Sequence, residues 1–114
     1  FVMVDVVFSN NSRHAFALQN REDNSKRASG FGFGAGLAAG PSTHRISLQP
    51  QEGEFGIKRG VKGSFDLYCR EKSITISVEY DVSSSGKVNN LKAEASDESV
   101  VRAEASSEIA IAGL

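Results

Sequence analysis

The side chains that most often perform chemistry in proteins are sparse in this chain of 114 residues. The two histidines, His14 and His44, do not stand at a spacing that gives two ligands to one metal ion, and Cys69 is the only cysteine. Cys69 shares the alternation of Phe65 and Leu67, which predicts a buried, inert thiol. A dyad of Cys69 with a histidine stays open as the alternative, because the members of such a dyad need not be neighbours in sequence.

Carboxylate and serine chemistry also find little support in the sequence. Glu52 and Glu54 would share one face of a strand, as the paired carboxylates of a glycosidase must, but acids are frequent here and a solvated pair is the simpler interpretation. The chain contains no Gly-x-Ser-x-Gly nucleophile elbow. We therefore predict a protein that is not an enzyme, with no catalytic residue, no metal ion and no cofactor.

Glycine alternates with apolar residues in the segment 30–40. A phosphate-binding loop is excluded, because no Lys-Ser/Thr pair follows the last glycine and Pro41 interrupts the helix that a dinucleotide site requires. Two interpretations remain. The segment is either a strand whose bare face lies close to another element, or an apolar loop that enters a lipid or ligand interface through Phe31 and Phe33.

Apolar and polar residues alternate along most of the chain, which is typical of half-buried β-strands. The clearest run is 74–82, where isoleucine, valine and tyrosine occupy one face. Clusters of Asn, Gly, Pro and Ser separate the runs and indicate turns. The pattern predicts an all-β fold, an antiparallel two-sheet β-sandwich of about nine strands that forms a single domain over residues 1–114. Residues 91–108 are rich in Ala and Glu, yet their valines and serines favour two short strands over a helix.

The distribution of charge bears on the partner. The net charge is −1, but residues 13–62 carry eight Lys and Arg against four Asp and Glu. This asymmetry is typical either of complementary faces of one domain or of a basic surface that meets an anionic partner. The chain as a whole is not basic and has no aromatic-rich basic motif, so we do not expect it to bind nucleic acid.

The cellular compartment is left open by the sequence. No apolar run is long enough to span a bilayer, and no basic segment precedes an apolar one as in a signal peptide. Because residue 1 is Phe, we expect a processed chain, and a secreted or membrane-associated location is favoured. The sequon Asn10-Asn11-Ser12 is compatible with secretion, whereas a lone cysteine favours a reducing compartment.

The stretch Gly-Val-Lys-Gly-Ser-Phe-Asp-Leu-Tyr at 60–68 resembles the Gly-x-x-Gly-Ser/Thr motif of the aegerolysins, which are small lipid-binding β-sandwich proteins. The order of neighbouring features is similar over roughly residues 4–90, although only this motif is specific. The chain departs from the family in having no tryptophan, no proline after Tyr80-Asp81, and an acidic tail without a counterpart. Actinoporin-like lectins and cytolysins share a related sandwich. Three other features are similar to that family. They are an opening strand at 4–6 that leads into an Asn-rich turn at 10–12, an aromatic residue followed by Asp at 80–81, and a loop with Gly and Asn at 85–89.

The resemblance implies recognition of a membrane lipid headgroup and a cytolysin-like role in toxicity or defence, with or without a partner protein that completes a pore. Aromatic side chains would lie at the interface and basic ones would meet the phosphate. Tyr80 also belongs to the apolar stripe of its strand, so a core position is its alternative. Two other functions stay open: a lectin that binds glycans, and a structural domain that associates with a protein partner or with itself. The implied lipid-binding residues are Tyr68, Lys62, Lys58, Arg59, Phe31, Phe33 and Tyr80.

Overall fold

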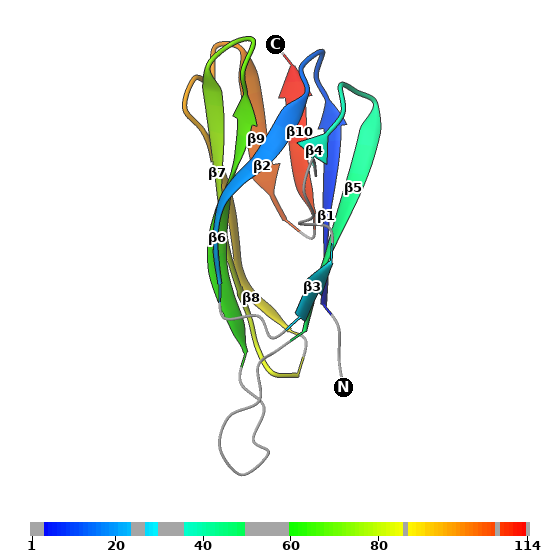
Figure 1. Ribbon diagram of the computed structural model, residues 1–114, viewed down its shortest axis with the longest axis vertical. Coiled ribbons are helices and arrows are strands. Elements are labelled where there is room, and N and C mark those ends of the chain that lie inside the picture. Colours follow the sequence, from blue (N-terminus) through cyan, green and yellow to red (C-terminus); the bar gives the residue numbers. More distant parts are fainter. Residues whose placement is uncertain are drawn as a thin grey trace.

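The computed structural model describes residues 4–23, 27–29, 36–49, 60–85, 87–106 and 108–113. These residues form ten strands and no helix, and the strands build two sheets that face each other (Figure 1). The predicted all-β, two-sheet architecture is thereby confirmed. In chain order the strands are β1 (Val4–Asn11), β2 (Phe16–Asp23), β3 (Arg27–Ser29), β4 (Gly36–Leu37), β5 (Ser42–Gln49), β6 (Val61–Cys69), β7 (Ile74–Val82), β8 (Val88–Ala95), β9 (Val101–Ala105) and β10 (Ile109–Gly113).

Each sheet has five strands, in the order β3-β5-β1-β10-β9 for the first and β4-β2-β6-β7-β8 for the second. All strand pairs but one are antiparallel; the exception is β1 with β10, which run parallel from Phe8 opposite Ile109 to Asn11 opposite Ala112. The expectation of purely antiparallel sheets is wrong at this pair. No hairpin joins these two strands, so no tight turn dictates that they run in opposite directions.

The core lies between the two sheets and is filled by the inward residues of both. Phe8 of β1 meets Phe65 of β6 edge to face, with ring centroids 5.5 Å apart and an interplanar angle of 70°. Cys69 is 1 % exposed, as its alternation with Phe65 predicts, so its thiol is withdrawn from solvent. The alternation at 74–82 is likewise confirmed, because every second residue of β7 from Ile74 to Val82 is buried.

A buried amide fixes the corner between β1 and β2. Asn10 is fully buried, and its Oδ1 accepts hydrogen bonds from the backbone N–H and the hydroxyl of Ser12, at 2.9 and 2.6 Å. Its Nδ2 donates to the carbonyls of His14 and Ala38, at 2.7 and 2.8 Å. All the polar capacity of this side chain is therefore used inside the protein. A glycan on the Nδ2 of Asn10, which the sequon would allow, is incompatible with this packing.

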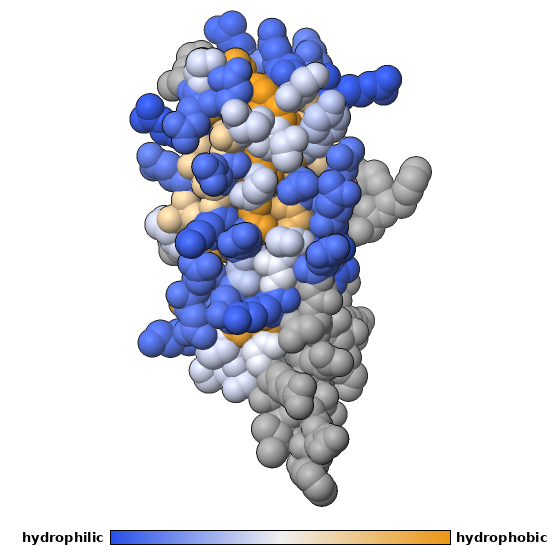
Figure 2. All heavy atoms as spheres, turned by 90° about the vertical axis from the view of Figure 1, so that its left-hand side faces the viewer, coloured by the Kyte–Doolittle hydropathy of each residue, from blue (hydrophilic) through white to orange (hydrophobic). Residues whose placement is uncertain are grey.

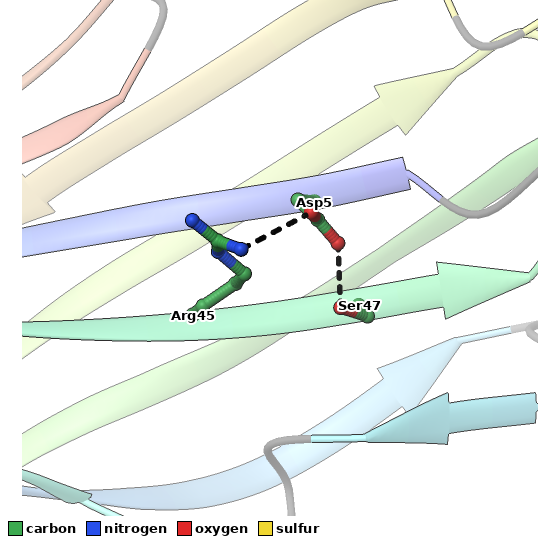
Figure 3. Close-up of polar contacts among 3 residues, drawn as sticks. All are labelled: Asp5, Arg45 and Ser47. Atoms are coloured by element: carbon green, nitrogen blue, oxygen red, sulfur yellow. Dashed lines mark hydrogen bonds and ion pairs between the residues drawn. The ribbon is translucent and has the colours of Figure 1, made fainter.

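Charges on the outer face of the first sheet are compensated within that face. Ser47 donates a hydrogen bond to Asp5, and the Arg45 guanidinium lies 3.9 Å from the other carboxylate oxygen of Asp5 (Figure 3). The contacts connect β5 to β1, which pair in register there. Exposed ion pairs of this kind add little stability. Their importance is that this face carries no uncompensated cation at Arg45.

Candidate functional site

Four of the residues predicted to contact lipid, Phe31, Phe33, Lys58 and Arg59, lie outside the residues that the structure describes. The structure therefore bears on the remaining three, Tyr68, Lys62 and Tyr80. It also bears on the end of the glycine-rich segment, of which residues 36–40 are described.

The described end of the glycine-rich segment takes the structural role that the sequence allowed. Gly36 and Leu37 form the short strand β4 and pair with Ala17 and Phe16 of β2. Leu37 is buried, and a Cβ on Gly36 would lie 2.6 Å from the carbonyl oxygen of Phe16. The bare face of this strand is needed because another backbone lies close against it.

Tyr80 lies in the core. It is 2 % exposed, and its ring centroid stands 6.1 Å from that of Phe65. A ring held in this way does not reach a lipid interface while the protein is folded. The structure thus supports the core position for Tyr80 and not the lipid-binding role.

Tyr68 and Lys62 point to the same outer face of the second sheet, as the alternation of β6 requires. They stand six positions apart on one strand, which separates them by about 20 Å at the rise of an extended chain. Tyr68 is half-buried near the β6–β7 turn, whereas Lys62 is exposed at the opposite end of the strand. A single ligand of the size of a lipid headgroup therefore does not contact both side chains.

The surroundings of Lys62 are unfavourable to a phosphate. Its Nζ lies 3.9 Å from the carboxylate of Asp81, and the shallow hollow beside it, of about 350 Å³, also has Glu79 in its lining. Two carboxylates beside one ammonium group repel an anion. Figure 2 views the molecule from the side on which β6 and β7 lie, and hydrophilic residues surround only a narrow strip of hydrophobic ones on it. The described residues on this face form no broad apolar surface for insertion into a bilayer.

A more cationic hollow lies at the end of the sandwich where three turns meet, the upper end in Figure 1. It has a volume of about 610 Å³. The β1–β2 corner, the β6–β7 hairpin and the β8–β9 loop each contribute to its wall, together with the end of β10. We call it the loop-end pocket. Its lining residues are Asn11, Ser12, Arg13, His14, Lys72, Ser99, Val100 and Gly113.

The loop-end pocket owes its charge to short turns rather than to strands. Arg13 and His14 occupy the corner that Asn10 fixes, and the hydroxyl of Ser12 accepts a hydrogen bond of 3.2 Å from the backbone N–H of His14. Lys72 lies in the β6–β7 hairpin, which Ser73 closes with a left-handed φ of 53°. The folding of these two turns therefore brings an arginine, a histidine and a lysine to one end of the molecule.

Asp97 stabilises the β8–β9 loop, which forms the opposite wall of the pocket. The carboxylate of Asp97 accepts hydrogen bonds from the hydroxyl and the backbone N–H of Ser99, and these bonds lower the pKa of Asp97 below its usual value. This closed local turn orients the residues between β8 and β9. Asp97 itself is not part of the lining of the pocket.

The donors of the loop-end pocket suit an oxyanion. Arg13 and Lys72 are cationic, and no carboxylate belongs to the lining that the described residues form. The Nδ1 atom of His14 is buried and has no hydrogen-bond partner among the described residues, which is an unusual state for a buried polar atom. Guanidinium, ammonium and imidazole groups are the side chains that hold phosphate and carboxylate groups through charge-assisted hydrogen bonds.

The sequence contains a partial signal for this pocket. The basic excess over residues 13–62 begins with Arg13, but Lys72 falls outside it and stands beside Glu71 in a turn of mixed charge. Nothing in the spacing connects Arg13 with Lys72, because two separate turns, the β1–β2 corner and the β6–β7 hairpin, bring them together.

Within the part of the chain that the structure describes, no three His, Cys, Asp or Glu residues come close enough to hold a metal ion. No helix in that part has the length and apolar character needed to cross a membrane. Comparison with other proteins adds no relative: the chain matches no protein-family model and no curated protein.

Proposed function

We propose that this chain is a non-enzymatic β-sandwich that binds membranes by holding phosphate-bearing lipid headgroups in the loop-end pocket. The observation that carries the proposal is the convergence of Arg13, His14 and Lys72 on a hollow in whose lining the described residues place no carboxylate. The hollow is large enough for a headgroup, at about 610 Å³. The proposal keeps the lipid-binding role that the resemblance implies and moves it from the Lys62 end of β6 to the turns.

The rest of the described surface is consistent with peripheral binding. Val88 is the one large hydrophobic residue that is exposed among the described residues, and it lies far from the turns that form the pocket. On the outer faces of the sheets, Arg45 lies beside Asp5 and Lys62 lies beside Asp81. Attraction to an anionic bilayer, worth about 1 kcal/mol for each basic residue near the surface, would act at the turns through Arg13 and Lys72.

The first test is co-sedimentation with vesicles of phosphatidylcholine alone and of phosphatidylcholine mixed with phosphatidic acid or phosphatidylserine. We expect binding to the anionic vesicles, and loss of most of it in the double variant Arg13→Ala, Lys72→Ala. The matched control is Lys62→Ala, Lys87→Ala, which changes the net charge equally, from −1 to −3, at the other end of the molecule. Dye release measured in parallel shows whether binding also opens the bilayer, as a cytolysin-like protein would.

The outcomes separate the candidate sites and functions. Equal loss in both double variants would show that net charge, not the loop-end pocket, governs binding. Loss only in the Lys62, Lys87 variant would return the site to the strand face that the sequence predicted. Failure to bind any vesicle, together with binding to immobilised glycans, would replace the lipid function with that of a lectin.

A further inference from the structure

The longest unpaired strand edge in the described part of the chain belongs to β8. Among the described strands, β8 pairs with β7 alone and so ends the second sheet, while β9 ends the first sheet on the same side of the sandwich. The remaining sheet edges, β3 and β4, have three and two residues, against eight in β8. A long edge strand exposes a row of backbone N–H and C=O groups that can pair with another strand.

Beside this edge lie apolar side chains that are only partly buried. Leu91 and Ala93 of β8, with Ala103 and Ala105 of β9, are partly buried hydrophobic residues that pack against the core. Together with Lys92, Glu94, Glu98 and Glu104, they line a groove of about 590 Å³ between the two edges. The four apolar side chains would lose further exposure to solvent if another strand were added along β8. Burial of this apolar surface therefore favours the pairing of another strand with this edge.

The charges along β8 indicate that the strand added at this edge is β8 of a second copy of the chain. Its centre reads Lys92-Ala93-Glu94, and both charged side chains are exposed on the outer face. If a second β8 pairs antiparallel to the first with Ala93 on the twofold axis, Lys92 of each copy stands opposite Glu94 of the other. Direct cross-strand pairs of opposite charge stabilise a sheet, and a twofold axis makes each such pair twice.

Apolar residues also match in this register. Leu91 of one copy falls opposite Ala95 of the other, so a large side chain meets a small one on the inner face of the joined sheet. Lys92, which on a lone edge would discourage pairing, is here compensated by its partner. We infer that two copies of this chain associate through antiparallel pairing of their β8 strands, giving a continuous ten-stranded sheet made of the two five-stranded ones.

This dimer is independent of lipid, so it is tested in solution without vesicles. Sedimentation velocity of the wild-type chain over a concentration series up to about 1 mM should show a monomer–dimer equilibrium. Lys92→Glu creates two pairs of facing glutamates across the axis, and Glu94→Lys creates two pairs of facing lysines. Each single variant should weaken the dimer by about tenfold or more, because two attractive pairs become repulsive.

The decisive variant is the exchange Lys92→Glu, Glu94→Lys, which restores opposite charges across the axis and should recover dimerisation to near the wild-type level. The matched control is Arg102→Glu, because β9 carries the same pattern, Arg102-Ala103-Glu104, on the other edge. It makes the same change in net charge and should leave the dimer intact. A far-ultraviolet circular dichroism spectrum checks that each variant keeps its strands.

Three results would overturn the inference. They are a wild-type chain that stays monomeric throughout the series, a charge exchange that fails to restore the dimer, and dissociation caused by Arg102→Glu but not by Lys92→Glu. If a variant unfolds, hydrogen exchange of the wild-type chain decides instead. Protection that rises with concentration should be confined to the amides of β8, and protection elsewhere would contradict this interface.

Discussion

The Nδ2 of Asn10 donates a 2.8 Å hydrogen bond to the carbonyl oxygen of Ala38, and so ties the end of β1 to the residue that follows β4. The same amide group closes the corner that presents Arg13 and His14. One buried side chain therefore connects the first sheet, the second sheet and the wall of the loop-end pocket. The stability of the corner and the geometry of the pocket should depend on it together.

Asn10→Ala should lower the free energy of unfolding by about 2–3 kcal/mol, because it leaves buried donors and acceptors without partners. Asn11→Ala is the matched control, since Asn11 is exposed at the next position. It should change stability by less than about 0.5 kcal/mol. Urea titration of both variants measures the difference, and equal stability of the two would contradict the anchoring role of Asn10.

Gly40 should not tolerate a side chain. A Cβ at this position would stand 1.9 Å from the backbone oxygen of Asn10, and backbone atoms cannot move aside as a flexible side chain can. Gly40→Ala should therefore destabilise the protein by about 2 kcal/mol or more. Gly113→Ala provides the comparison, because its Cβ would make only ordinary contacts with Ser12, at 3.4 and 3.5 Å. Thermal unfolding should separate the two variants clearly, and similar midpoints would argue against the close approach.

The hydrogen bonds from Ser99 should make a pH-dependent contribution to stability. They lower the pKa of Asp97 in the folded chain below its ordinary value of 3.8, so they favour the ionised carboxylate. Such a group stabilises the fold above the unfolded pKa, and the stabilisation is lost as the pH falls through the folded pKa. Ser99→Ala should lower the thermal midpoint at pH 7, and the deficit should shrink as the pH falls below 3.8. Ser84→Ala, in an exposed turn, should show no such trend.

Membrane binding through the loop-end pocket should depend on salt. Raising the ionic strength from about 0.05 to about 0.5 M shortens the range of attraction between Arg13, Lys72 and an anionic bilayer, so the bound fraction should fall. The residual binding of the Arg13→Ala, Lys72→Ala variant should be nearly insensitive to the same change. A wild-type chain that binds equally well at both salt concentrations would show that attraction of the two cations is not the driving term.

The sequence predicted the positions of the strands better than it predicted which strands pair with each other. Alternation along 74–82 identified both faces of β7, and the position of Cys69 relative to Phe65 identified a buried thiol. These predictions succeeded because the side-chain period of a strand is a local property. The parallel pairing of β1 with β10 was missed because it depends on two segments at opposite ends of the described chain.

The candidate site was predicted less well, for the same physical reason. Alternation along β6 puts Tyr68 and Lys62 on one face, but it carries no information on the acids that surround Lys62. Arg13 and Lys72 line the same pocket only because the β1–β2 corner and the β6–β7 hairpin lie at the same end of the sandwich. Whether lipid is bound at either place stays a prediction.

The parallel pair of β1 with β10 has a consequence for biosynthesis. β1 is the middle strand of the first sheet, and one of its two neighbours is the last strand that the structure describes. During translation, β1 can recruit β5 early, but its other edge stays open until residue 113 has left the ribosome. Contacts between segments so distant in sequence slow folding and lengthen exposure of unpaired edges. The nascent chain should therefore acquire resistance to proteases only after β10 has left the ribosome.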